Sequence, residues 1–273
     1  SKDASFISIP YPFVPRCALE AVIACGGGSK PVVVRYYMAA LTLLLEYVHS
    51  FDIVFRGMDP ETMTIDEHGE LRLTDFRFAK RLSASDDAPG RTFTSCGAAA
   101  YMAPEVVKGL GHDERADWFS LGAFLAHLLR GSPPFGMTVS YKTYQAICEC
   151  NLTDIFRTDA DPLAVSLAQT LLVVNPDDRP RDAQAVKSHA LFAAFDWDTV
   201  AARPPPPEIE ALTRDAYRGR GVPPIRDATE PSTSSSKSHH FASAATNFNW
   251  CDAYMSLDTI APYPPPSPNL PPY

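Results

Sequence analysis

The sequence predicts an α+β fold that is mainly helical. Apolar residues recur at helical spacing in Val33–His49 and again from Asp113 onward, and a short pair of strands is expected between these segments. Near residue 200 the composition changes, and the rest of the chain is rich in proline and serine and poor in aliphatic residues. We therefore expect an irregular start over 1–31, a packed domain over 32–200, and a largely disordered tail over 201–273.

Composition excludes several classes of function. The chain has 273 residues, of which 45% are hydrophobic, which is enough to bury a core. Its net charge of −8 gives no electrostatic footprint for a nucleic-acid partner. We expect no apolar run of the roughly 18 residues that a membrane-spanning helix needs, and the start lacks the apolar core of a signal peptide. We therefore predict a cytoplasmic protein with no membrane span.

The segment Val33–His49 is predicted to be a central helix. Tyr36, Ala40, Leu43 and Tyr47 recur three or four residues apart, which places them on one face of a helix. An apolar stripe that extends from Tyr36 to Tyr47 along a single helix is typical of a helix in the core of a domain.

A β-hairpin is expected after this helix. Thr62–Ile65 and Leu71–Thr74 have the composition of short strands, and the turn Asp66–Gly69 lies between them. Glycine adopts the left-handed backbone conformation that a tight turn requires. The sequence therefore predicts two antiparallel strands here.

Helical periodicity returns at Asp113. An apolar stripe extends along this segment, and Gly131 followed by two prolines is expected to end it. The stripe consists of Trp118, Leu121, Leu125 and Leu128. Tyr141–Cys148 and Leu163–Val174 are predicted to form two further helices.

Five short motifs follow one another in the middle of the chain. They are Val54-Phe-Arg-Gly-Met-Asp-Pro-Glu-Thr62, Thr74-Asp-Phe-Arg-Phe-Ala-Lys80, Thr92-Phe-Thr-Ser-Cys-Gly97, Tyr101-Met-Ala-Pro-Glu105 and Ala116-Asp-Trp-Phe-Ser-Leu-Gly122. In this order they resemble the catalytic loop, the Asp-Phe-Gly segment, the activation loop, the Ala-Pro-Glu motif and the following helix of protein kinases. The resemblance extends from about Val32 to Ile209 and is nearest to the AGC group, in particular to the G-protein-coupled-receptor kinases.

The resemblance implies a kinase C-lobe over 32–200, with a remnant of the N-lobe and the hinge over 1–31 and an AGC-like C-tail over 201–273. Leu19–Gly28 looks like the last N-lobe strand and the hinge, followed by a shortened helix. We find no Gly-rich phosphate loop before it, and no strand with an ATP-binding lysine or helix with its partner glutamate. This favours a truncated kinase fold.

The residues that perform the chemistry in kinases are changed. By position in the motifs, Gly57 replaces the catalytic Asp, Asp59 replaces the nearby Lys, and Thr62 replaces the metal-binding Asn. Arg77 replaces the glycine of Asp-Phe-Gly, and Ala98 replaces a threonine that braces the catalytic loop in kinases. Asp75 alone remains as a candidate Mg²⁺ ligand. ATP and Mg²⁺ are therefore weak candidates as ligands, and no other cofactor is indicated.

The exchange of Lys for Asp59 is expected to matter most. It turns an attraction to the transferred phosphate into a repulsion, and at about 4 Å and an effective dielectric constant of about 20 each is worth roughly 4 kcal/mol. A tenfold loss of rate needs only about 1.4 kcal/mol. The cation of Arg77 could offset part of this repulsion.

The residues that maintain the architecture of a kinase are kept. The resemblance assigns Arg56 to contacts with the activation segment and Asp117 to the catalytic-loop backbone, and it pairs Glu105 with Arg179. Changes at the chemical positions, with the scaffold retained, favour a fold that no longer transfers phosphate.

Smaller signals concern partners and modification. Thr94 lies at the usual activation-loop phosphorylation site, and Glu61 resembles an acidic residue that recognises basic substrates. The aromatic segment Phe248–Tyr254 resembles a docking motif of AGC tails, with a disordered stretch as the alternative. Pro264–Pro268 is a candidate ligand for SH3- or WW-type domains.

The sequence thus favours a catalytically impaired, pseudokinase-like signalling module that acts through protein interactions. The first alternative is an AGC-type Ser/Thr kinase, of the receptor-kinase kind, with weak or residual activity. The second is a degenerate kinase fragment without activity.

Overall fold

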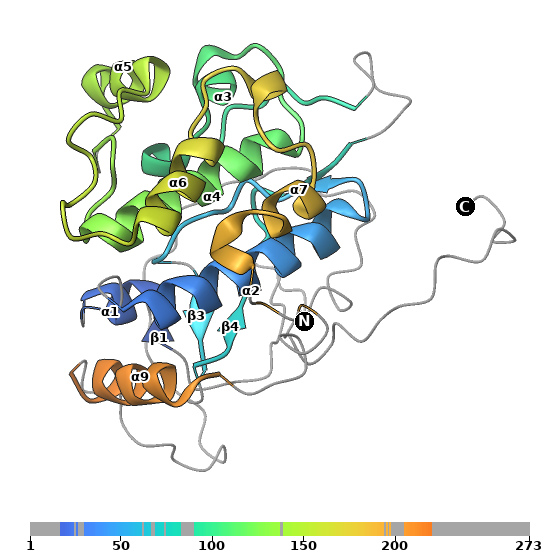
Figure 1. The fold of residues 1–273 in the computed structure, drawn as a ribbon. Coiled ribbons are helices and arrows are strands. Elements are labelled where there is room, and N and C mark those ends of the chain that lie inside the picture. The colour runs from blue at the N-terminus through green and yellow to red at the C-terminus, as the bar shows by residue number, and fades with distance from the viewer. Residues whose placement is uncertain are drawn as a thin grey trace, which may run out of the picture.

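The structure is a computed structural model that describes residues 17–24, 26, 30–61, 63–66, 69–73, 75–82, 90–136, 139–193, 195, 197 and 205–219. Helices dominate it, as predicted (Figure 1). The α-helices are α1 Leu19–Ala24, α2 Pro31–His49, α3 Pro104–Lys108, α4 Arg115–Arg130, α5 Tyr141–Glu149, α6 Pro162–Leu171, α7 Ala183–Lys187 and α9 Pro207–Gly219. Short 3-10 helices are η2 Ala99–Tyr101, η3 Pro176–Asp178 and η4 Ala190–Phe192.

The strands in the described residues are short and form two small antiparallel sheets. Strands β1 (Cys17–Ala18), β3 (Thr64–Ile65) and β4 (Leu71–Arg72) form one sheet in the order β1-β3-β4, and β2 (Ile53–Val54) pairs with β5 (Lys80–Arg81) in the other. Strands β3 and β4 are the predicted hairpin, with Thr64 opposite Arg72. Gly69 closes it with a φ of +90°, as its residue type suggests. Thr62 and Thr74 lie outside the described residues.

Helix α2 is the central helix of the domain, as predicted. Pro31 begins it, where the missing amide donor costs nothing. Figure 1 shows α2 crossing the middle of the domain, and it packs against α4, α7 and β4. With 19 residues and a mean hydropathy of 1.3 it is long and apolar enough to cross a membrane, which corrects the sequence-based expectation that no run reaches this length. Most of it is buried inside the domain, as in a core helix.

Helices α4 and α6 pack closely at one glycine. A β-carbon on Gly122 would lie 2.7 Å from the β-carbon of Leu171, so this contact requires a residue without a side chain. Gly131 ends α4 with a φ of +84°, as predicted. Asp161 caps the start of α6, because its side chain accepts a hydrogen bond from the Leu163 amide. The predicted helix Leu163–Val174 ends earlier, because Leu172 has non-helical torsion angles.

The first described segment differs from its prediction. Leu19–Gly28 was expected to contain the last N-lobe strand and the hinge, but only Cys17–Ala18 are extended and Leu19–Ala24 form helix α1. Leu19 and Val22 lie one turn apart and are both completely buried, so a helix buries them on one face. Apolar and β-branched residues in a short run suggest a strand, and tertiary packing overrides that preference here.

Helix α9 lies beyond the predicted domain boundary at residue 200, inside the tail predicted over 201–273, and the prediction that this tail is largely disordered is not tested after Gly219. Ile209, Leu212, Thr213 and Ala216 have helical spacing and are buried, and the helix packs against α1 and α2 (Figure 1). A β-carbon on Gly69 would lie 2.6 Å from Cγ2 of Ile209, so the hairpin turn packs directly against this helix. The packed core therefore extends past residue 200, where the composition suggested its end. Residues 220–273 lie outside the described part of the chain.

Candidate active-site region

Asp117 anchors the segment that follows β2. Its carboxylate is 1% exposed, and its two oxygens accept hydrogen bonds from the backbone amides of Phe55 and Arg56, both at 2.8 Å. His49 Nε2 lies 2.8 Å from the same carboxylate. Helix α4 thus holds the loop that carries Gly57 and Asp59, which is the structural role that the sequence assigned to Asp117.

Arg56 joins this loop to the segments that follow. It has a φ of +55°, and its Nε donates to the carbonyl of Phe78 at 2.7 Å, while Nη1 lies 3.4 Å from the carbonyl of Thr94. A β-carbon on Gly97 would lie 2.7 Å from the carbonyl oxygen of Arg56, so the two segments touch through their backbones. Arg56 therefore contacts the activation segment, and the side chain of Thr94 is exposed.

Position 57 has no side chain, and an aromatic ring fills the adjacent space. A β-carbon on Gly57 would lie 2.9 Å from Cζ of Phe55 and 3.1 Å from its Cε2. The Phe55 ring is 2% exposed and packs edge-on against Phe76, with 5.5 Å between the ring centroids. Any side chain at position 57 would require this buried ring to shift.

Asp59 brings a carboxylate to the position where kinases have a lysine. One of its oxygens accepts a hydrogen bond from the Glu61 amide at 3.0 Å. Burial raises the pKa of Asp59, the negative charges of Glu61 and Asp75 raise it further, and the Arg77 cation lowers it. Thr62, the remaining changed position in this loop, lies outside the described residues.

Asp75 is paired with Arg77, two residues further along. Its Oδ2 lies 2.5 Å from Nη2 of Arg77, and its Oδ1 accepts a hydrogen bond from the Arg77 amide at 3.1 Å. The bond to Asp75 raises the pKa of Arg77, so the guanidinium stays charged. Among the residues that the structure describes, no group of three or more His, Cys, Asp or Glu side chains could hold a metal ion.

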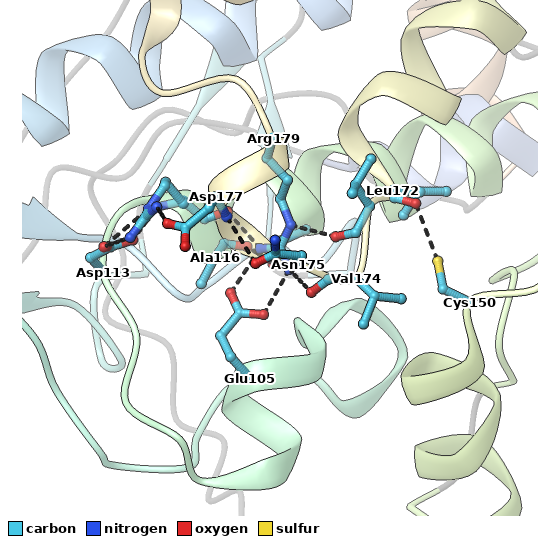
Figure 2. Close-up of polar contacts among 12 residues, drawn as sticks. Glu105, Asp113, Ala116, Cys150, Leu172, Val174, Asn175, Asp177 and Arg179 are labelled. Carbon is cyan, nitrogen blue, oxygen red and sulfur yellow. Dashed lines mark hydrogen bonds and ion pairs between the residues drawn. The ribbon is translucent and has the colours of Figure 1, made fainter.

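Glu105 and Arg179 form the ion pair that the sequence predicts. The two carboxylate oxygens accept hydrogen bonds from Nη1 and Nη2 of Arg179, both at 2.7 Å, and the Arg179 side chain is completely buried. Figure 2 shows Arg179 pointing from its loop toward Glu105 on α3, with the carbonyl of Val174 also in reach. The end of the activation segment is thereby fixed to the loop after α6.

A small acidic cavity lies beside the loop. Its volume is about 140 Å³, and its lining includes Glu20, Asp59 and Glu61 together with Ala98 and His127. The sequence motifs indicate Glu61, Asp59 and Ala98, but they do not include Glu20 or His127. A histidine inside the apolar run of α4 is the signal that could have drawn attention to this position.

His127 is a buried neutral base at the wall of this cavity. Its Nδ1 lies 2.7 Å from the Tyr101 hydroxyl and its Nε2 lies 3.7 Å from Glu20. Burial lowers the pKa of His127 to about 4, against about 6.5 for an unperturbed histidine. The imidazole is therefore neutral at pH 7, and its contact with Glu20 is not an ion pair at that pH.

Acidification should therefore destabilise the domain through His127. Between about pH 6.5 and pH 4 the unfolded chain binds more protons at this residue than the folded chain, so stability falls as the pH falls through this window. The melting temperature should fall less for His127→Gln than for the parent chain when the pH is lowered from 7.5 to 5. Equal losses in both proteins, measured by thermal denaturation in matched buffers, would contradict this prediction.

Two further predictions fall on parts of the chain that are not described. Phe248–Tyr254 and the proline run Pro264–Pro268 both lie outside the described residues, so neither docking prediction is tested.

Comparison with known proteins agrees with the motifs and the fold. The family model described as "Protein kinase domain" matches residues 2–192. The "cAMP-dependent protein kinase catalytic subunit PRKX" of Mus musculus is 33% identical over 218 residues, which are 78% of this chain and 59% of that protein. "Ribosomal protein S6 kinase alpha-3" of Homo sapiens is 34% identical over 184 residues, which are 66% of this chain and 24% of that protein.

The chain therefore belongs to the protein kinase family. Its relatives among cAMP-dependent and S6 kinases place it in the AGC group. The finer resemblance to receptor kinases stays a prediction. The chain spans about three fifths of the first relative and a quarter of the second.

Proposed function

We propose that this chain is a catalytically impaired, pseudokinase-like module that acts through protein interactions. The observation that carries the proposal is the environment of Gly57. Kinases use a carboxylate at this position to accept the proton of the substrate hydroxyl. Here the position has no side chain, and the buried ring of Phe55 lies against it.

The charge at Asp59 supports the same conclusion. Phosphoryl transfer depends on stabilising negative charge on the transferred group, and a carboxylate in place of a lysine acts in the opposite direction. Burial and neighbouring carboxylates raise the pKa of Asp59, whereas Arg77 lowers it. Because the Arg77 guanidinium is paired with Asp75, it neutralises the charge of Asp59 only in part.

The retained scaffold favours a role in binding. Asp117 and the Glu105–Arg179 pair hold the loop and the activation segment in place. The cavity with Glu20, Asp59 and Glu61 favours a partner that presents a basic side chain, because three carboxylates line it. Phosphorylation of exposed Thr94 would add an anion near Arg56, so the activation segment is a candidate regulatory element. A cytoplasmic location stays part of this proposal.

An AGC-type Ser/Thr kinase with residual activity is the second candidate, because Asp75 is kept and lies near Asp59 and Arg77. A degenerate fragment without a role is the third. When the chain is incubated with Mg-ATP and an arginine-rich peptide, the peptide should incorporate no more phosphate than in a control without the chain. Turnover that is lost in Asp75→Asn would overturn the proposal, because a contaminating kinase would not respond to that substitution.

The interaction is tested with the same peptide in fluorescence anisotropy. The parent chain should bind it, and Asp59→Asn combined with Glu61→Gln should weaken binding, by about tenfold if each charge contributes a typical surface pair. Glu208→Gln is a matched control, because it removes an exposed carboxylate from α9 instead. Absence of binding by the parent chain would favour the degenerate fragment.

A further inference from the structure

We propose that Arg77 is a built-in cation that takes the place of a divalent metal ion at Asp75. This deepens the proposed function, because it gives a reason why the Asp-Phe-Arg segment would not support phosphoryl transfer. Of the motif positions that bind the divalent ion in kinases, only Asp75 keeps its residue type, and this carboxylate already has a cationic partner.

Both oxygens of Asp75 are engaged by the same residue. The guanidinium approaches Oδ2 at 2.5 Å and the backbone amide donates to Oδ1 at 3.1 Å. Magnesium requires oxygen ligands at about 2.0–2.1 Å in near-octahedral geometry and keeps several waters. A guanidinium in contact with the carboxylate occupies this volume and repels a second cation, so the arrangement does not fit a magnesium ion.

The position of the arginine in the chain makes the contact local. Asp75 and Arg77 are separated by one residue, and the hydrogen bond from the Arg77 amide fixes the turn that brings them together. The Arg77 side chain stays 65% exposed, and its guanidinium lies 5.9 Å from the centre of the Phe78 ring. No change elsewhere in the fold is needed to form the pair.

Arg77 also acts on the second acid of the region. The charges of Asp75 and Arg77 both influence Asp59, so two carboxylates and one guanidinium share this site. Removal of the guanidinium would take one positive charge away from Asp75 and Asp59. Carboxylate oxygens are the ligands that hard divalent cations prefer.

A structural role for the pair makes a different prediction. Exposed ion pairs contribute about 0–1 kcal/mol, so Arg77 is not expected to hold the fold together. Arg77→Gly should melt within a few degrees of the parent chain, whereas a change in metal affinity should be large. The two roles can therefore be separated by measuring both quantities on the same proteins.

The probe is Mn²⁺ without nucleotide, and free Mn²⁺ is counted by electron paramagnetic resonance in the presence of the full chain. Arg77→Gly should bind Mn²⁺ about tenfold more tightly than the parent chain, because one repulsive charge is removed and one carboxylate is freed. Arg77→Lys keeps the cation and should bind as weakly as the parent. The double variant Asp75→Asn with Arg77→Gly should lose the gained site, which assigns it to Asp75.

Equal Mn²⁺ affinity in the parent chain and in Arg77→Gly overturns the proposal, whether both bind or neither does. A gain that survives Asp75→Asn overturns it too, because the metal would then lie elsewhere. Failure of the proposed function is distinguishable, because that failure is phosphorylation of a peptide by the parent chain. A melting curve for each variant establishes that it is folded before its metal affinity is compared.

Discussion

Arg179→Ala should lower the free energy of unfolding by about 3–5 kcal/mol, which is the cost of leaving one partner of a buried ion pair alone. Arg179 is completely buried and Glu105 is 6% exposed, so water cannot replace the lost guanidinium. The guanidinium also donates to the carbonyls of Val173 at 2.6 Å and Arg115 at 3.0 Å. These two carbonyl groups would lose their donor in the same substitution.

Chemical denaturation of the parent chain and the variant gives this difference. Arg181→Ala is a matched control, because Arg181 is exposed and lies two residues away. Arg179→Lys should recover only part of the loss, since an ammonium cannot form the two parallel bonds that Glu105 accepts. An unchanged midpoint for Arg179→Ala would show that this pair does not hold the activation segment to the loop after α6.

Asp117→Ala should destabilise the domain by about 2–4 kcal/mol. The substitution leaves two backbone amides, those of Phe55 and Arg56, without the carboxylate that they bind at 2.8 Å. An unsatisfied buried polar group costs about 1–3 kcal/mol, and more when the lost bond involves a charge. Arg56 has a positive φ, a conformation that the lost bonds help to hold.

The loss should be visible as a lower melting temperature and as faster amide hydrogen exchange at Phe55 and Arg56. Asp177→Ala is the control, because Asp177 is 74% exposed and its ion pair with Arg115 lies at the surface. If the two aspartate variants melt at the same temperature, the anchoring role of Asp117 is wrong.

Long periodic segments were predictable from the sequence. Helices α2 and α4 carry apolar residues at a strong helical spacing, and Gly131 marks the end of the second. The hairpin was predictable because Gly69 supplies the conformation that its turn requires. These features depend on local spacing and on residue type, which the sequence states directly.

Segments with mixed local signals were not predictable. Helix α1 is an apolar run that is compatible with a strand, and only its packing against α9 and the sheet selects the helix. Helix α9 lies in a proline-rich region whose average composition concealed the spacing of Ile209, Leu212 and Ala216. Composition averaged over a long window is a poor guide to a helix of 13 residues.

The identities of the site residues were predictable, but their interactions were not. Motif positions alone indicate Gly57, Asp59, Asp75 and Arg77. The ring of Phe55 against Gly57 depends on side-chain rotamers, which the motif does not specify. The sequence raised an offset of Asp59 by Arg77 only as a secondary alternative, and the direct partner of Arg77 is Asp75, two residues before it.

The position of α9 has a practical consequence for producing shorter pieces of this protein. A fragment that stops at residue 200 would remove helix α9, which packs against α1 and α2 and buries Ile209 and Ala216. Newly exposed apolar surface promotes self-association. A stop codon or a purification tag is therefore better placed after Gly219 than at the boundary that composition alone suggests.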